Sequence, residues 1–152
     1  MVNQRESGKI MKTLYTKTQD IQNAWHIVDA TDRPLGDVAS RVASLVRGKH
    51  KADYAPHQFI GDFVIVVNID KLRMTGKKAD DKKYYHHSHY PGGLRTFSYK
   101  ELSSRRPEAP LRKAIKGMLP KGPLGNKMLR AVKLYAGDKH PHAAQQPAVY
   151  TW

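Results

Sequence analysis

The segment Asp62–Asn68, DFVIVVN, decides the fold class of this 152-residue chain. Its apolar run, residues 63–67, is too short for a typical helix and is rich in β-branched residues, so it predicts a strand covered on both faces. Upstream, Ala24–Asp29 (AWHIVD) predicts a first strand, which is closed by the turn-forming residues up to Pro34. Strands that are buried on both faces are typical of parallel sheets.

An amphipathic helix is predicted between these two strands. From Leu35 onward, apolar residues at positions 35, 38, 39, 42, 45 and 46 fall on one stripe at about 100° per residue, and polar residues take the opposite face. Asp32 is the predicted N-cap and Gly48 the predicted C-cap. Strand, helix and buried strand form the order of a right-handed βαβ unit, so we expect a compact α/β core at about residues 22–76.

The second half has a looser pattern. Ser98 and Glu101 match a capping box that opens a short helix. Residues 108–119 predict another helix, with glycine and proline at 122–125 breaking the chain before a last periodic stretch at 128–135 and an irregular tail at 137–152. The apolar face of the helix at 108–119 is predicted to hold Leu111, Ala114, Ile115 and Met118.

The positive charge of the chain is concentrated in this second half. Residues 1–70 carry nine Lys and Arg against eight Asp and Glu, whereas residues 71–152 carry eighteen against five. The two parts therefore have net charges of +1 and +13. A net charge of about 2–8 is enough to keep a small domain soluble, and further like charge opposes compaction. The imbalance indicates a polyanionic partner.

Composition also limits the cellular context and the domain count. The chain has no cysteine, which excludes disulfides and thiolate metal sites and is consistent with a reducing compartment, so we expect a cytoplasmic protein. No apolar run approaches the length of a membrane span and residues 1–12 lack the apolar region of a signal peptide, so we expect neither insertion nor export. One domain is expected over residues 11–152, with the polar residues 1–10 forming an extension to which we assign no function.

Templates for enzymes and metal sites do not fit the sequence. It lacks the glycine-rich loops that bind nucleotide phosphates, and the adjacent pair Asp80 and Asp81 is flanked by lysines, as in an exposed loop. His86, His87 and His89 do not share one strand face, and no nearby cysteine or carboxylate completes a metal shell, so we expect no metal or other cofactor. His26 in the first strand is expected to be a partly buried residue with its hydrogen bonds satisfied.

Nucleic-acid binding fits the second half better. The segment from Lys77 to Arg95 combines four lysines and an arginine with Tyr84, Tyr85, Tyr90 and three histidines, which places phosphate-binding cations beside rings able to stack on bases. Strand alternation sends Tyr84 and Tyr85 to opposite faces, so one of the two is expected to face the core.

The predicted helix at 108–119 offers a second basic surface. Arg112, Lys113 and Lys116 lie on one face, and an exposed pairing of Arg112 with Glu108 is the alternative to phosphate binding. We favour phosphate binding because this face has too few acids to neutralise it.

Seven sequence blocks, in order along the chain, resemble the large-subunit ribosomal protein thirteen family in its bacterial or organellar form. The resemblance extends from about Met11 to Tyr150. The blocks are Trp25–Ala30; Leu35-Gly36 with Ala39-Ser40 and Arg47-Gly48-Lys49; Gly61-Asp62 with Val66-Val67-Asn68; Thr75-Gly76-Lys77-Lys78; His87-Ser88 with Tyr90-Pro91-Gly92-Gly93; Gly117-Met118-Leu119-Pro120; and His140-Pro141-His142 with Gln145 and Pro147.

The resemblance implies a three-layer α/β/α fold on a mostly parallel sheet, with basic loops and a C-terminal tail. It also implies a non-enzymatic role: binding large-subunit rRNA early in assembly, as a monomer within the ribosome beside neighbouring ribosomal proteins, with no membrane and no small-molecule substrate. Asp37 stands where many relatives have a basic residue after Leu-Gly. The resemblance therefore does not imply an RNA contact for the helix that begins at Leu35.

The list of rRNA contacts comes from charge and aromatic content rather than from the resemblance. The predicted contacts are Arg47, Lys49, Lys51, Lys77, Lys78, Lys82, Lys83, Tyr84, His86, His87, His89, Tyr90, Arg95, Arg105, Arg106, Arg112, Lys113, Lys116, Lys121, Lys127, Arg130, His140 and His142. Two alternatives remain open: a nucleotide-using or RNA-modifying enzyme on the same core, and a general basic DNA or RNA binder.

Overall fold

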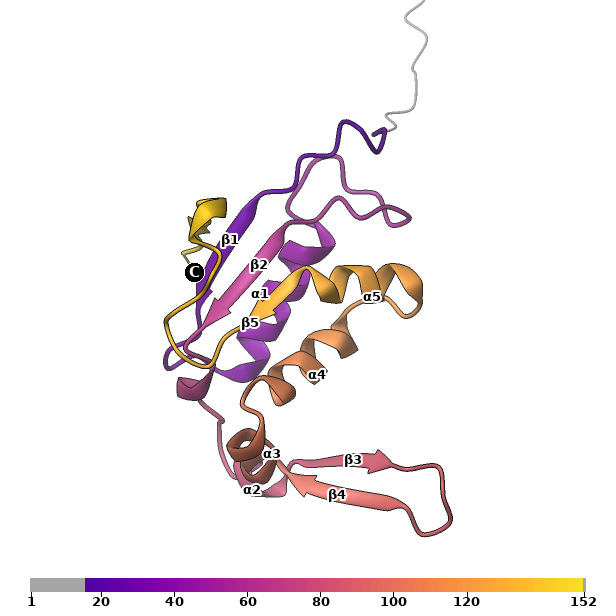
Figure 1. Ribbon diagram of the computed structural model, residues 1–152, viewed down its shortest axis with the longest axis vertical. Coiled ribbons are helices and arrows are strands. Elements are labelled where there is room, and N and C mark those ends of the chain that lie inside the picture. Colours follow the sequence, from indigo (N-terminus) through magenta and orange to yellow (C-terminus); the bar gives the residue numbers. More distant parts are fainter. Residues whose placement is uncertain (1–15, 152) are drawn as a thin grey trace, which may run out of the picture.

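The computed structural model describes residues 16–151 and consists of a four-stranded parallel sheet, flanking helices and a separate β-hairpin (Figure 1). The predicted extension at residues 1–10 lies outside the described residues. The sheet has the order β5-β2-β1-β6, in which β1 is Trp25–Asp29, β2 is Phe63–Val67, β5 is Val132–Leu134 and β6 is Ala148–Val149. The predicted α/β class with a mostly parallel sheet flanked by helices is confirmed.

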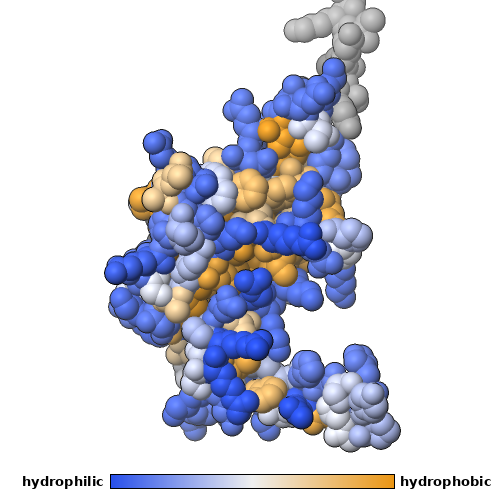
Figure 2. Space-filling view, in the orientation of Figure 1, coloured by the Kyte–Doolittle hydropathy of each residue, from blue (hydrophilic) through white to orange (hydrophobic). Residues whose placement is uncertain are grey.

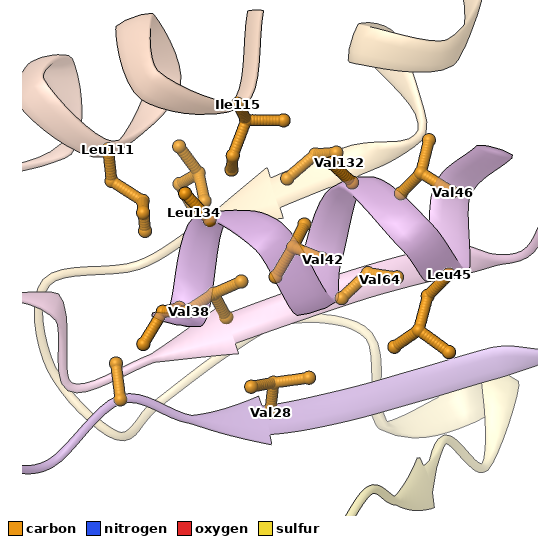
Figure 3. Packing of buried hydrophobic residues seen from close by; sticks show 14 of the residues in the cluster. Val28, Val38, Val42, Leu45, Val46, Val64, Leu111, Ile115, Val132 and Leu134 are labelled. Carbon is orange, nitrogen blue, oxygen red and sulfur yellow. The ribbon is translucent and has the colours of Figure 1, made fainter. Parts of the chain in front are cut away.

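The predicted strand–helix–strand unit is present. Helix α1, Leu35–Arg47, joins β1 to β2, and Val64, Ile65 and Val66 of β2 are fully buried, as the unbroken apolar run predicted. The apolar stripe of α1 packs on one face of the sheet. Figure 3 shows its valines gathered with those of β1 and β2, with Leu111 and Ile115 adjoining from a second helix.

The two predicted caps of α1 had different outcomes. Gly48 is the C-cap in the left-handed conformation (φ 81°), and its N–H donates to the carbonyls of Ser44 and Leu45, so that prediction is confirmed. Asp32 is not the N-cap. It has φ 54° in the turn before the helix, while Pro34 holds the N-cap position with extended backbone and no side-chain cap. Proline fixes its own φ, which sets the chain direction into the helix.

The core is not confined to residues 22–76. Strands β5 and β6 complete the sheet, and helices α4 (Glu108–Met118) and α5 (Pro123–Arg130) add Leu111, Ile115 and Met128 to the same buried cluster. The tail is therefore not irregular throughout, since it includes β6 and a 3-10 turn, η2 (Ala143–Gln145). The near-neutral first half and the basic second half share one core.

Two details of α4 and α5 differ from the prediction. Met118 is 45% exposed and Leu119 is buried instead, because the helix ends at Met118 and the extended backbone at Leu119 turns that side chain inward. Of the residues at 122–125 that were expected to separate two helical stretches, only Gly122 lies between α4 and α5, whereas Pro123 and Gly125 belong to α5. Pro123 occupies the first turn of α5, where a missing N–H costs nothing, and an added Cβ at Gly125 would lie 1.7 Å from the carbonyl oxygen of Pro120.

The hairpin extends away from the sheet (Figure 1). It pairs β3 (Lys83–His87) with β4 (Leu94–Ser98) in antiparallel register. Helix α3, Tyr99–Arg105, follows directly and begins with the predicted capping box of Ser98 and Glu101. Two short helices precede the hairpin: η1 (Ile69–Lys71) and α2 (Lys78–Asp81), whose last two residues are the aspartates expected in a loop.

Candidate nucleic-acid interface

The hairpin separates its aromatic residues by face. Cross-strand pairs share a face, so Tyr84 pairs with Phe97 on one side and Tyr85 with Thr96 on the other. Tyr84 is 9% exposed and Tyr85 is 61% exposed. The expectation that one tyrosine faces inward is confirmed. Stacking of Tyr84 on RNA stays a prediction, and the burial of its ring argues against it.

Lysines cover the buried tyrosine ring and connect the hairpin to helix α4. The Lys113 Nζ lies 5.1 Å from the centroid of the Tyr84 ring, and the Lys82 Nζ lies 5.7 Å from it. Burial raises the pKa of the Tyr84 hydroxyl, which keeps this ring neutral between the two ammonium groups. Cation–π contacts of this kind fix the direction of a cation on the surface.

A further cation lies beside the hairpin. The Arg105 guanidinium at the end of α3 lies 5.3 Å from the Phe97 ring centroid. On α4, Arg112 and Lys116 are exposed, as Lys113 is. Arg112 faces Glu108 at 3.6 Å, but both side chains are nearly half exposed, so this pair contributes little stability. Figure 2 shows a hollow between the hairpin and the body of the molecule, with hydrophilic side chains beside it.

A second basic recess lies at the end of α5. It is lined by Arg112 of α4, Arg130 of α5 and Lys133 of β5. Lys133 is absent from the predicted contacts, since a single lysine in a three-residue strand has no periodic signal. Lys133 therefore joins the basic surface only because β5 packs beside α4 and α5.

Most of the predicted contacts are exposed and available to a ligand. The exposed residues are Lys49, Lys77, Lys78, Lys82, Lys83, His86, His87, His89, Tyr90, Arg95, Arg105, Arg106, Arg112, Lys113, Lys116, Lys121, Lys127 and Arg130. Arg47, Lys51, His140 and His142 are intermediate in exposure, and Tyr84 is buried.

Lys51, one of the predicted contacts, has its partners inside the protein. Its Nζ donates to the carbonyl oxygens of Gln22 (2.6 Å) and Ile60 (2.9 Å) and lies 2.6 Å from Oδ1 of Asp62. An ammonium has three donors, and all three are used inside the protein. The phosphate contact of Lys51 stays a prediction, and these contacts argue against it because the buried carboxylate requires this charge as its partner.

Asp62 is the centre of a buried polar cluster. It is 1% exposed; Oδ1 also accepts the N–H of Ala24, and Oδ2 lies 3.1 Å from the Nε2 of His26 and 2.8 Å from the Nε2 of His50. Burial opposes ionisation of this carboxyl, but the hydrogen bonds from Lys51, Ala24 and His26 outweigh it, so the pKa of Asp62 lies below its ordinary value. The expectation of a satisfied, partly buried His26 is confirmed.

The tail histidines also have structural contacts. The Nε2 of His142 is 2.8 Å from the hydroxyl of Tyr135, and its ring centroid is 5.4 Å from that of Trp25. Its backbone N–H donates to Nδ1 of His140. These contacts attach the tail to β1 and to the end of β5, which gives His142 a role in the fold.

A comparison with known proteins agrees with the motif blocks. Residues 23–141 match the family described as Ribosomal protein L13. The chain belongs to this family. It is 56% identical over 137 residues to "Large ribosomal subunit protein uL13" of Nitrosomonas europaea, covering 90% of this chain and 95% of that relative. Similar relatives with the same name come from Azoarcus sp. (58% over 139 residues, covering 91% and 98%) and Treponema pallidum (55% over 137 residues, covering 90% and 96%). The family resemblance expected from the sequence is confirmed.

Proposed function

We propose that this protein is a structural constituent of the large ribosomal subunit that binds large-subunit rRNA and supports early subunit assembly. The observation that carries the proposal is the set of exposed cations on the hairpin, α3, α4 and α5, of which Arg105 and Lys113 lie against rings of the hairpin. Several fixed cations neutralise closely spaced phosphates with less ordering cost than flexible peptides do. The family membership and the names of the relatives support this role over an enzymatic one.

The exposed residues of the hairpin, α3, α4 and α5 are the proposed contacts, with Tyr85 and Lys133 added and with Tyr84 and Lys51 removed. We propose that RNA shape is recognised more than base sequence, because most of these groups are cations suited to phosphates. Residues 11–152 act as one domain in this proposal, and the protein sits as a monomer in the ribosome beside neighbouring ribosomal proteins. Among residues 16–151, every helix is too short or too polar to cross a membrane.

Salt dependence of binding to large-subunit rRNA tests the proposal. Contact with roughly 6 to 10 phosphates predicts a log–log slope of about −4 to −9 for affinity against salt. Bulk duplex DNA as competitor distinguishes a specific rRNA protein from a general polyanion binder, because only the general binder is displaced equally well by DNA. A flat salt response would contradict the proposal. Co-sedimentation with large subunits through a high-salt wash tests the ribosomal location.

A further inference from the structure

Three ligand atoms of the kinds that bind transition metals converge at the amino-terminal end of the sheet. They are Nε2 of His26 on β1, Nε2 of His50 in the loop after α1, and Oδ2 of Asp62 immediately before β2. All three atoms lie within 4.8 Å of one another. The two histidines meet Asp62 from separate segments of the chain, so the spacing of histidines along the sequence does not reveal the group.

Two of the three distances within this group are close to those in a tetrahedral metal shell. Ligand atoms bound to Zn²⁺ at about 2.0–2.1 Å are about 3.3 Å apart. The distances from Oδ2 to the two Nε2 atoms, 3.1 Å and 2.8 Å, require only small changes to reach this value. The two imidazole nitrogens lie within 4.8 Å of each other, and the exposed His50 ring can move to bring them to the same spacing. Two imidazoles and one carboxylate are the donors of several zinc sites that keep a fourth position for water. The His50 side chain is 38% exposed, which leaves a solvent approach to that position.

The surrounding backbone holds Asp62 in place. An added Cβ at Gly61 would lie 1.8 Å from the carbonyl oxygen of Val46, so the chain before Asp62 packs directly against the end of α1. Oδ1 is held by the Ala24 N–H and by Lys51, which orients Oδ2 toward the histidines. Groups that orient a ligand in this way strengthen metal sites.

We propose that His26, His50 and Asp62 form a binding site for a divalent transition metal ion, with Zn²⁺ as the reference ion. The metal replaces the hydrogen bonds to Oδ2: each neutral imidazole carries its proton on Nδ1 and offers the Nε2 lone pair, and water completes the shell. The ammonium of Lys51 beside Oδ1 opposes the incoming charge, so binding is reversible and the hydrogen bonds maintain the same geometry without metal. This inference does not depend on RNA binding.

Titration of the full chain with Co²⁺ tests the site, because tetrahedral Co²⁺ has visible d–d absorption and Zn²⁺ displaces it. The wild type is expected to bind one ion in this site. His50→Ala and His26→Gln are each expected to lower the affinity about tenfold or more. His26→Gln keeps an amide donor for Oδ2, and circular dichroism establishes that each variant is folded.

The control variant replaces His87 and His89 together with alanine. Their rings are 5.8 Å apart on the exposed hairpin, so they test whether metal binds there. Unchanged binding in this control, together with loss in the two cluster variants, supports the site. The proposal is overturned if the wild type shows no tetrahedral absorption, if folded His50→Ala and His26→Gln bind as well as the wild type, or if the hairpin variant abolishes binding.

Discussion

Lys51 and Asp62 form a buried ion pair in which Nζ lies 2.6 Å from Oδ1, with the two side chains 19% and 1% exposed. The same ammonium holds two backbone carbonyls, from Gln22 and Ile60. The pair therefore joins the segment before β1, the loop after α1 and the start of β2. Buried pairs of this kind are costly to form but much more costly to break, because one charge is then left without a partner.

Asp62→Ala is expected to destabilise the protein by about 3 kcal/mol, since it leaves the partly buried ammonium of Lys51 without its counter-charge and the Ala24 N–H without its acceptor. The measurement is the free energy of unfolding in urea. The matched control is Asp53→Ala, an exposed aspartate in the loop before β2. An effect of Asp62→Ala no larger than that of the control would show that the cluster contributes nothing to stability.

Stability is expected to fall as the solution is acidified. The pKa of Asp62 is lowered in the folded state, as is the pKa of Asp29, which accepts hydrogen bonds from Asn68 and Thr31. A lowered folded pKa contributes stability that is complete above the unfolded value of 3.8 and is lost as the pH falls through the folded pKa. Urea midpoints measured from about pH 6 down to about pH 2 test this sign. A midpoint that rises on acidification would contradict it.

Lys113→Ala combined with Lys116→Ala is expected to weaken binding to large-subunit rRNA and to reduce the magnitude of the salt slope by about 2, because each phosphate-bound lysine contributes about 1. The measurement is affinity by filter binding at several salt concentrations. Arg41→Ala, an exposed cation on α1, is the control and should leave the slope unchanged. Equal salt slopes for the wild type, the double variant and Arg41→Ala would exclude α4 from the interface.

Substitutions of the two adjacent tyrosines are expected to have different effects: one weakens rRNA binding and the other lowers stability. Tyr85→Ala should weaken rRNA binding by about 1–3 kcal/mol if its exposed ring stacks on a base, with little change in stability. Tyr84→Ala should instead destabilise the protein by about 3 kcal/mol, because its ring is buried at the base of the hairpin. Urea unfolding and rRNA binding are measured for both. Loss of binding without loss of stability in Tyr84→Ala would reverse the assignment.

Gly61→Ala is expected to destabilise the protein by about 1–3 kcal/mol or more, because the new Cβ would lie 1.8 Å from the Val46 carbonyl oxygen and the backbone would have to move. Gly117→Ala is the control: Gly117 lies on the exposed face of α4 with no atom within 4 Å of an added Cβ, and the substitution should stabilise the protein by about 0.5–1 kcal/mol. Thermal unfolding of both variants is the measurement. A tolerated Gly61→Ala would mean that this contact is not a constraint on the fold.

Local elements were predictable from the sequence because their signals are local. The apolar run of β2, the stripe of α1, the C-cap at Gly48 and the capping box of Ser98 each depend on residues within a few positions of one another. The N-cap of α1 was mispredicted because Asp32 suited a cap by residue type, while the fixed φ of Pro34 decided where the helix begins.

The sequence by itself determined the family, the βαβ unit and the concentration of charge in the second half. Only the tertiary structure decided that β5 and β6 complete the sheet, that Tyr85 rather than Tyr84 is exposed, and that Lys51 is paired with Asp62. The physical reason is burial. Which side chain loses water, and which partner must then satisfy it, depends on segments that are distant in sequence and adjacent only after folding.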